Sequence, residues 1–280
     1  MQLVNGVALG AGYALLAVGW TVLLGAAKLV NFAHGQFYML GAFVTWYTID
    51  RFGWPYLTAI PIALVAVAIM GFVIQLLMTR MAVEQNIVSM MVTTLAFGYL
   101  IEGGAAMVFG GDPQVIPSPF DNKTFNLGSS RFTQQDLLIV IAKIVLYVAT
   151  FYVLRRTGIG RIVRGVAEDP KLAQLYGISA AKVYIGVFVF AAAAAALAGA
   201  VMAPRSPILT SMGFQEVILT FLVVVLGGVG RVFGALVAGL GLGIFVAIWS
   251  VWLPPSYSTA AAFAVLLVFL STRPEGIKTK

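Results

Sequence analysis

Nine apolar runs, separated by glycine, proline and charged residues, constrain this 280-residue chain more than any other feature. They lie near residues 5–27, 31–49, 56–79, 87–110, 136–154, 183–203, 214–229, 232–252 and 256–272. A helix needs about 20 apolar residues to cross the hydrocarbon core of a bilayer. Hydrophobic residues make up 61% of the chain and charged residues 10%. We therefore expect an all-α fold, a polytopic transmembrane helical bundle with about eight to nine spans.

Two of these runs are candidates for broken or re-entrant helices. The run at 214–229 is short and is followed by a glycine-rich turn, and interrupted segments of this kind reach only partway across the membrane in transporters. The run at 31–49 carries the same ambiguity, because it opens with polar residues. Because so many spans leave little chain for a folded domain outside the membrane, we expect residues 1–280 to form a single transmembrane domain.

Small residues at four-residue spacing predict close packing between helix backbones. Examples are Gly6 with Gly10 and Gly239 with Gly243. Spacing of this kind is common at helix contacts in membrane bundles, so ordinary packing is a sufficient explanation for it.

Basic residues give the expected orientation. Six of the 17 lysines and arginines lie between Arg155 and Lys182, and the positive-inside tendency assigns this loop, about 155–182, to the cytoplasm. Nine spans then place the N-terminus outside and the C-terminus inside, in agreement with the basic ending RPEGIKTK. The polar, proline-containing segment at about 111–135 becomes the largest external loop.

Several function classes are disfavoured by what the sequence lacks. Without cysteine there is no thiolate metal site, and a single histidine provides no multi-histidine metal cluster. The chain contains no GxxxxGK[ST] phosphate loop, so it does not bind ATP by the usual route, and neither GxSxG nor HExxH occurs. A net charge of +7 in a membrane protein indicates cytoplasmic loops rather than a nucleic-acid partner.

A short capped helix is predicted inside the basic loop. In VAEDPKLAQLYGIS, Asp169 is an N-cap candidate, Pro170 takes the first helical position and Gly177 follows the end of the helix at Tyr176. Three apolar side chains can share one face of this helix: Leu172, Leu175 and Tyr176. Because this face lies outside the bilayer, either the loop's own neighbours or another protein must cover it. The flanking basic residues also fit a second interpretation, in which they fix topology and attract anionic lipid.

Four blocks of the sequence together resemble the permease family of branched-chain amino-acid ABC importers. They are NFAHGQFYMLGAF, GRIVRGVAEDPKLAQLYGI, VVVLGGVGRVFGALVAGLGLG and RPEG, in the family's order. The resemblance extends over essentially the whole chain and is closer to the shorter of the family's two permeases. It implies a multi-pass protein of a bacterial-type inner (cytoplasmic) membrane. Branched-chain amino acids are the implied default substrate, with urea, short amides and aromatic acids carried by related systems.

The resemblance also implies the partners. They are a second homologous permease, two cytoplasmic ATPase subunits that bind the ATP and Mg, and an external substrate-binding protein, so this chain needs no cofactor and is not itself an enzyme. The loop around Glu168 would be the segment that couples the chain to an ATPase. The coupling candidates are Arg161, Arg164, Glu168, Asp169, Leu172, Leu175, Tyr176 and Gly177. The general importer pattern of Glu-Ala-Ala before a glycine and a later Leu-Pro is only partly present.

Polar residues within the apolar runs are the candidates for lining a pathway. They are Asn31, His34, Gln36 and Glu102. If the helix opens near residues 32–35, the first three can satisfy freed backbone groups and line a cavity. Alternatively, they cap or cross-link helices near the cytoplasmic end of the span.

Ionisable residues in or near the apolar runs also have simpler expected roles. Glu102 is a candidate to pair with Lys143, although Lys143 could instead extend to an interface. Glu216 is expected near the outer surface, where it could meet the binding protein. A stand-alone secondary transporter or channel is the rival function, but it would call for ion-coupling residues in the spans or a filter-like loop.

Overall fold

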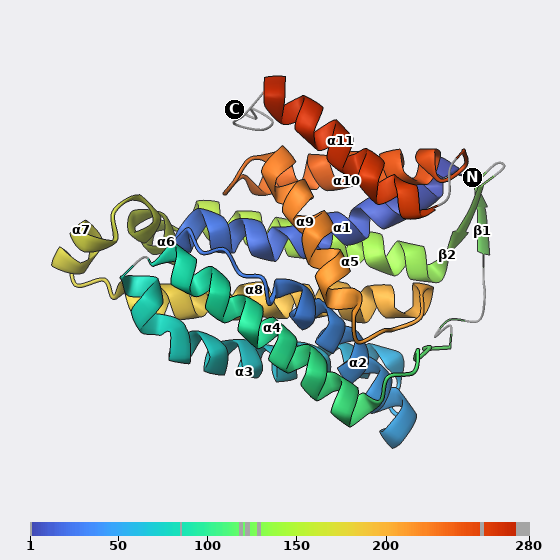
Figure 1. Cartoon of the computed structure of the whole chain (residues 1–280), viewed down its shortest axis with the longest axis horizontal. Coiled ribbons are helices and arrows are strands. Elements are labelled where there is room, and N and C mark those ends of the chain that lie inside the picture. The colour runs from blue at the N-terminus through green and yellow to red at the C-terminus, as the bar shows by residue number, and fades with distance from the viewer. Residues whose placement is uncertain are drawn as a thin grey trace.

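The chain forms a bundle of long helices with one small hairpin (Figure 1). The computed structural model describes residues 2–84, 86–117, 120, 124–127, 130–252 and 255–272. Six helices in this part of the chain are long and apolar enough to cross a membrane: α1 (Gln2–Ala27), α3 (Tyr56–Val83), α4 (Ile87–Phe109), α5 (Gln134–Arg156), α8 (Ala180–Met202) and α10 (Val232–Trp249). The count of eight to nine spans is therefore not confirmed, although the other three apolar runs are also largely helical: α2 (His34–Phe52), α9 (Met212–Gly227) and α11 (Pro255–Thr272).

The predicted loops contain more secondary structure than expected. In the external loop, β1 (Thr124–Leu127) pairs antiparallel with β2 (Ser130–Thr133), a small exception to the all-α prediction. The basic loop folds into α6 (Gly158–Glu168) and α7 (Pro170–Leu175). Figure 1 places the hairpin at one end of the bundle, beside the start of α1, and α6 and α7 at the other end. Parts of the external loop and the ending RPEGIKTK lie outside the described residues, and the orientation in the membrane stays a prediction.

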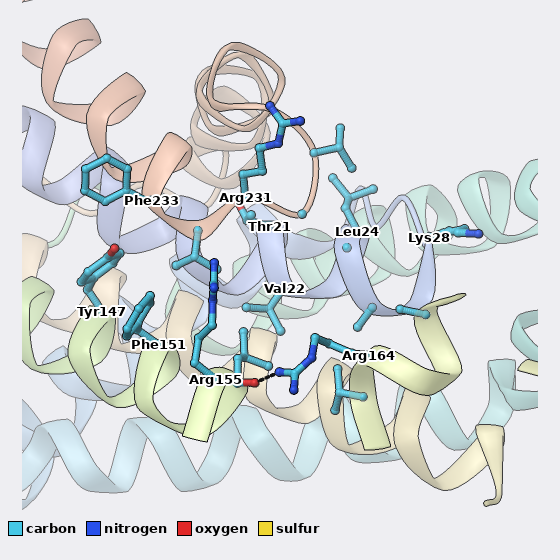
Figure 2. A pocket seen from close by; sticks show the side chains of 18 residues that line it. Thr21, Val22, Leu24, Lys28, Tyr147, Phe151, Arg155, Arg164, Arg231 and Phe233 are labelled. Atoms are coloured by element: carbon cyan, nitrogen blue, oxygen red, sulfur yellow. Dashed lines mark hydrogen bonds between the residues drawn. The ribbon is translucent and has the colours of Figure 1, made fainter. Parts of the chain in front are cut away.

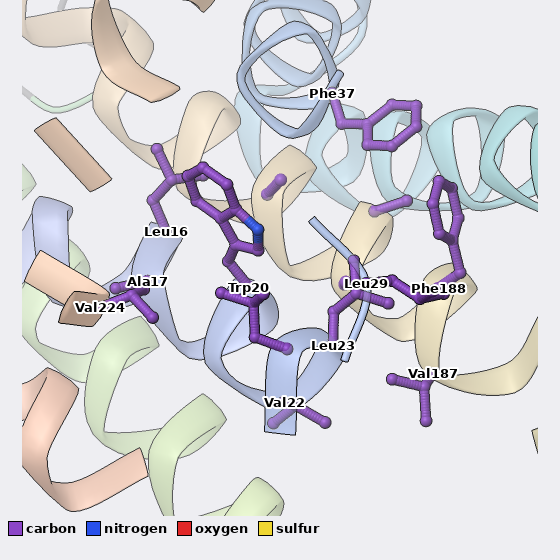
Figure 3. Packing of buried hydrophobic residues seen from close by; sticks show 14 of the residues in the cluster. Leu16, Ala17, Trp20, Val22, Leu23, Leu29, Phe37, Val187, Phe188 and Val224 are labelled. Carbon is purple, nitrogen blue, oxygen red and sulfur yellow. The ribbon is translucent and has the colours of Figure 1, made fainter. Parts of the chain in front are cut away.

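Helix α1 runs through the middle of the bundle and supplies much of its core. Leu16, Trp20 and Leu23 are fully buried, and they pack with residues of α2, α8 and α9 in one continuous cluster (Figure 3). At the same core, the ring of Phe37 on α2 meets the ring of Phe188 on α8 edge to face, with the ring centroids 5.8 Å apart. A helix that is apolar on all sides is typical of such a central position.

The predicted glycine contacts join α1 to α10. A Cβ atom on Gly10 would lie 2.8 Å from the carbonyl oxygen of Gly239, and one on Gly239 would lie 2.8 Å from the Cα of Ala14. Real Cβ contacts are not this short, so only glycine permits this approach. The packing role predicted for Gly10 and Gly239 is confirmed.

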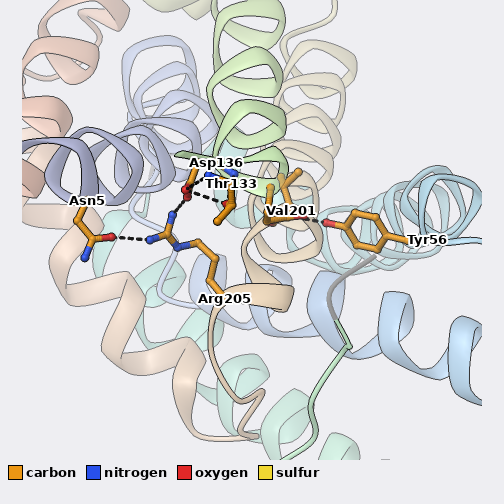
Figure 4. A network of polar contacts seen from close by, with 7 residues as sticks. Asn5, Tyr56, Thr133, Asp136, Val201 and Arg205 are labelled. Carbon is orange, nitrogen blue, oxygen red and sulfur yellow. Dashed lines mark hydrogen bonds and ion pairs between the residues drawn. The ribbon is translucent and has the colours of Figure 1, made fainter. Parts of the chain in front are cut away.

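A polar network ties the helices together at the end near the hairpin (Figure 4). Thr133 and Asp136 form a capping box at the start of α5, in which each side chain accepts a hydrogen bond from the other residue's backbone N–H. Asp136 also pairs with Arg205, which follows α8 and donates a 2.8 Å hydrogen bond to Asn5 on α1. The hydroxyl of Tyr56, at the start of α3, donates a 2.9 Å hydrogen bond to the carbonyl oxygen of Ala200. Four helices are therefore cross-linked at this end by groups that the sequence analysis did not identify.

Candidate functional site

Two helices begin inside the bundle, and their first turns meet. Before α2, residues 28–33 are not helical, and Lys28 has a left-handed φ of 54°. Before α9, residues 206–211 are also not helical. A Cβ atom on Gly35 would lie 2.7 Å from the carbonyl carbon of Gly213, so the two helix starts touch through glycine backbone. We call this contact between the first turns of α2 and α9 the helix-start seam.

The helix-start seam lies at about half the length of α1. His34 is the first residue of α2, and its Nε2 donates a 3.1 Å hydrogen bond to the carbonyl oxygen of Leu16. Leu16 lies near the middle of α1, which at 26 residues is about 39 Å long. The expectation that His34 cross-links helices is thus confirmed. His34 also stands at the end of its own helix, as expected, but this end lies beside the middle of α1 rather than beside an end of α1.

Polar side chains accept hydrogen bonds from backbone N–H groups in the non-helical segment before α2. The Asn31 side-chain oxygen accepts a 3.0 Å hydrogen bond from the backbone N–H of Ala33. The backbone N–H of Phe32 donates a 3.1 Å hydrogen bond to the hydroxyl of Thr94 on α4. The chain is not helical at residues 28–33, so the predicted opening at 32–35 is present only in part, because His34 and Gly35 already belong to α2. A buried backbone group without a hydrogen-bond partner would be costly. Thr94 was missed by the sequence analysis, because a lone threonine in an apolar run carries no distinguishing signal.

The side-chain amide of Gln36 has no partner. Its oxygen and nitrogen are both buried without a hydrogen bond, and so are Nδ1 of His34 and Nδ2 of Asn31. Gln36 lies against the start of α9, where a Cβ atom on Gly213 would fall 2.7 Å from its Cδ. Leaving a buried polar group unpaired costs about 1–3 kcal/mol. The seam therefore holds donors and acceptors that a polar solute or water could satisfy if α2 and α9 moved apart.

Two expectations for charged residues are wrong. Glu102 on α4 and Lys143 on α5 do not pair, since the two ion pairs among the described residues are Arg80 with Glu84 and Arg205 with Asp136. One carboxylate oxygen of Glu102 is instead buried without a hydrogen-bond partner. Glu216 does not lie near the outer surface, because it follows Gly213 by one turn of α9.

Glu216 is near Tyr13, in the middle of α1. The sequence gives no sign of this position, because a short apolar run does not show whether its helix begins at the membrane surface or inside the bundle. Its carboxylate therefore belongs to the neighbourhood of the helix-start seam.

The second candidate site is the predicted capped helix, α7. The side chain of Asp169 accepts hydrogen bonds from the backbone N–H groups of Lys171, at 2.9 Å, and Leu172, at 3.0 Å. Gly177 follows the helix with a φ of 79°, a left-handed conformation that glycine adopts readily. The N-cap, the proline start and the glycine after the end are all confirmed, and the helix ends one residue earlier than predicted.

The apolar face of α7 is not covered by any part of the chain that the structure describes. The exposed fractions are 50% for Leu172, 84% for Leu175 and 78% for Tyr176. Ala173 points the other way and is buried, which holds α7 against its own loop. Of the two explanations left open for this face, cover by neighbouring residues of the loop is wrong. We call Leu172, Leu175 and Tyr176 the α7 face.

The remaining coupling candidates lie on or beside α6. Arg161, Arg164 and Glu168 are all exposed on this helix, and Arg164 Nη1 donates a hydrogen bond to the carbonyl oxygen of Leu154 at the end of α5. Helix α6 was not predicted. The hydroxyl of Thr157 caps its first turn, accepting a hydrogen bond from the N–H of Gly160, and this threonine was the available signal.

A metal site has no evident ligands in the described part of the chain, where no group of three or more His, Cys, Asp or Glu side chains comes together.

The matching family model and the similar proteins all have the same description, that of a branched-chain amino acid transport permease. The model of the family described as branched-chain amino acid transport system / permease component matches residues 2–270. The permease protein LivH of a high-affinity branched-chain amino acid transport system in Escherichia coli is 30% identical over 99% of this chain and 94% of its own length. BraD of Pseudomonas aeruginosa, also described as such a permease, is 28% identical over the same shares of the two chains. LivM of Escherichia coli is 23% identical over 95% of this chain and 67% of its own length. No solved structure matches.

Proposed function

The chain belongs to the branched-chain amino acid transport system permease family, and from this premise we propose that it is a substrate-conducting subunit of an ATP-binding-cassette importer. In this proposal it pairs with a second, homologous permease in a bacterial inner membrane. Two cytoplasmic ATPases bind ATP and Mg and supply the energy, while an external binding protein delivers the solute. The N-terminus faces outside and the C-terminus faces the cytoplasm.

The α7 face is the observation that carries the coupling proposal. Three large apolar side chains project from a capped helix at one end of the bundle, in a loop that is rich in basic residues. Covering such a face with a partner protein removes apolar surface from water, at about 25 cal/mol per Å2. A membrane-surface helix would be expected to be longer than the six residues of α7 and to carry more aromatic anchors. We therefore assign the α7 face to an ATPase subunit.

Movement of α7 has a direct route to the helix-start seam. Helix α6 packs against α5 and α1, and α1 contacts His34 of α2 through the carbonyl oxygen of Leu16. A displacement of α6 on ATP binding can therefore change the fit of α1 against α2 and α9. Packed helices of this kind shift between discrete arrangements rather than deform continuously.

The pathway in this proposal opens along the helix-start seam. When α2 and α9 separate, Asn31, His34 and Gln36 present uncharged hydrogen-bonding groups, and Glu102 adds a carboxylate from α4. A branched-chain amino acid carries one ammonium group, one carboxylate and an apolar side chain, and all three find matching groups in such a lining. We expect the binding protein, rather than this lining, to select the substrate.

The test is ATPase turnover of the reconstituted complex with its binding protein. We expect the double change Leu172→Asp with Leu175→Asp to abolish stimulation by substrate or to release the ATPase subunits, because charged groups on the α7 face cannot be buried. The candidates to add are leucine, isoleucine, valine, urea, short amides and aromatic acids. The one that stimulates the unaltered complex most strongly identifies the substrate.

A matched control tests whether the effect depends on the α7 face or on any charge added to α7. Gln174 is exposed on α7 but lies off the apolar face, so Gln174→Asp adds the same charge as Leu175→Asp and should leave stimulation close to that of the unaltered complex. If the double variant assembles and keeps full stimulation, the coupling proposal fails. Solute uptake by this chain alone, without any ATPase, would instead favour a stand-alone transporter or channel.

A further inference from the structure

Three polar side chains from three different helices lie close together beside the helix-start seam. They are Tyr13 on α1, Tyr38 on α2 and Glu216 on α9. The carboxylate of Glu216 interacts electrostatically with the hydroxyl groups of both tyrosines, and the two hydroxyl groups interact with each other. We call these three side chains the three-helix cluster.

The contact between α1 and α2 brings the two tyrosines together. Tyr13 precedes Leu16 by about one turn of α1, and Tyr38 follows His34 by about one turn of α2. Residues one turn apart share a helix face. Because His34 donates its hydrogen bond to the carbonyl oxygen of Leu16, the two tyrosines lie on the faces that α1 and α2 turn toward each other.

Glu216 joins the cluster from the third helix. It follows Gly213 by about one turn of α9, and Gly213 packs against Gly35 in the first turn of α2. Glu216 and Tyr13 are partly exposed, whereas Tyr38 is only 7% exposed. A solute that enters between the helices can therefore reach the carboxylate although it lies inside the bundle.

The charge of Glu216 is not balanced by a cation in the part of the chain that the structure describes. The two ion pairs found there join other residues, Arg80 with Glu84 and Arg205 with Asp136. An ionised carboxylate within a membrane bundle is costly unless a positive group or hydrogen-bond donors compensate it. The three-helix cluster therefore favours a positively charged ligand.

An ammonium group has the chemistry that this cluster can bind. It carries three N–H donors, and the cluster supplies three accepting groups, one carboxylate and two hydroxyls. A resident divalent metal ion fits less well, because it needs about six oxygen ligands and no three acidic or histidine side chains come together among the described residues. We propose that the three-helix cluster binds the α-ammonium group of the amino acid that passes along the helix-start seam. This inference rests on the proposed function.

The hollow at the α6 end of the bundle has the opposite charge. It has a volume of about 1010 Å3, and its cationic lining residues are Lys28, Arg155, Arg164 and Arg231 (Figure 2). No aspartate or glutamate occurs among its lining residues. Figure 2 shows Lys28 pointing away from Arg155 and Arg164, so these cations do not converge on one point. An ammonium group is repelled from this hollow and attracted to Glu216.

The test is thermal unfolding of the purified permease and ATPase complex, without its binding protein, in the presence of leucine, isoamylamine or isocaproate. Isoamylamine is leucine without the carboxylate, and isocaproate is leucine without the ammonium group. We expect leucine and isoamylamine to raise the melting temperature in a saturable way, and isocaproate to leave it unchanged. Glu216→Gln, Tyr13→Phe and Tyr38→Phe should each weaken the binding of isoamylamine by about tenfold or more, because each removes an acceptor from a charged donor.

Glu84→Gln is the matched control, because it removes a carboxylate whose side chain is 57% exposed at the end of α3. It should leave the shifts unchanged. Glu216→Asp retains the charge and should retain part of the shift, which provides a test even if Glu216→Gln folds poorly.

Four results would overturn the proposal: no saturable shift with isoamylamine, equal shifts with isoamylamine and isocaproate, the same saturable shift with sodium ions, or a shift that Glu216→Gln does not change. Loss of the shift in Glu102→Gln alone would place the ammonium group on α4 and would also overturn it. Leucine uptake by the complete importer tests the proposed function separately. A complex that transports leucine but is not stabilised by isoamylamine would therefore refute the ammonium site and leave the proposed function standing.

Discussion

Gly35 and Gly213 bring the first turns of α2 and α9 into backbone contact, and a side chain on Gly35 would lie 2.7 Å from the carbonyl carbon of Gly213. Both helices begin at about the middle of α1, and both are preceded by chain that is not helical. In hydrocarbon, backbone without internal hydrogen bonds is tolerated only where it is buried in protein or lines a cavity. The contact therefore marks the part of the bundle where two helices begin inside it instead of crossing the membrane in full.

Replacing Gly35 with alanine should destabilise the protein. The added methyl group meets backbone rather than a flexible side chain, so α2 and α9 must separate, and overpacking of this kind costs about 1–3 kcal/mol. We expect a lower melting temperature in detergent and reduced uptake. Gly186→Ala on α8 is the control, because nothing lies within 4 Å of a Cβ atom there. Equal melting temperatures for the two variants would contradict the close contact.

Replacing Gln36 with leucine should raise stability and lower transport. Neither side-chain amide atom of Gln36 has a partner, so an apolar side chain of similar size removes an unpaired group without breaking a hydrogen bond. We expect a gain of up to about 1–3 kcal/mol, seen as a higher melting temperature, together with slower uptake in proteoliposomes. A lower melting temperature would mean that the amide is satisfied in the folded protein. Unchanged uptake would remove Gln36 from the pathway.

Replacing Asp169 with alanine should loosen α7 without unfolding the bundle. The Asp169 carboxylate accepts hydrogen bonds from two N–H groups of the first turn, and losing such a cap costs about 0.5–2 kcal/mol of helix stability. Hydrogen exchange at Lys171 and Leu172 should become faster, and ATPase stimulation should fall. Asp169→Asn keeps a capping side chain and should behave nearly as the unaltered protein does. If alanine and asparagine have equal effects, the cap is not the reason for the aspartate.

Asp136 and Arg205 should show strong coupling in a double-mutant cycle. Their side chains are only 10% and 21% exposed, and Asp136 also caps α5, so removing Arg205 leaves a largely buried carboxylate without its partner. We expect Arg205→Gln and Asp136→Asn each to lower stability, and the double variant to be more stable than the sum of the two losses implies, by about 0.5–3 kcal/mol. Additive losses in thermal unfolding would show that the pair contributes nothing beyond its separate hydrogen bonds.

Local signals in the sequence were sufficient to predict many of the helices. Apolar runs located the long helices because a membrane span requires about 20 such residues in sequence. The cap at Asp169 and the glycine at 177 located α7 because capping depends on residues a few positions apart. Helix α6 was not predicted, because residues 155–182 were assigned to a loop from their basic residues alone, although Thr157 caps the helix.

Long-range relationships could not be predicted in this way. Nothing near Gly35 in the sequence indicates Gly213, and nothing near Asp136 indicates Arg205. The pairing expected for Glu102 and Lys143 was based on opposite charge and similar depth, but depth along a helix does not fix the direction in which a side chain points. Glu216 was misplaced for a related reason, since a short helix can begin inside the bundle as readily as at its surface.

The coupling proposal depends on the α7 face, and the absence of cysteine from the chain allows a single thiol to be placed there. It contains no cysteine, so Leu175→Cys introduces a single thiol at a side chain that is 84% exposed. Met107→Cys is the control, because Met107 is 90% exposed on α4 and lies toward the opposite end of that helix from α7.

The decisive measurement is labelling of these two thiols by a water-soluble maleimide in inside-out membrane vesicles, before and after the ATPase subunits are stripped and restored. We expect the Leu175→Cys thiol to be labelled only when the ATPases are absent, and to be joined to an ATPase by a short bifunctional cross-linker when they are present. In the proposed orientation position 107 faces the lumen of these vesicles, so it should stay unlabelled with and without the ATPases and show that the vesicles are sealed. If position 175 reacts equally with and without ATPases and no cross-link forms, the α7 face is not the docking surface and the coupling proposal is wrong.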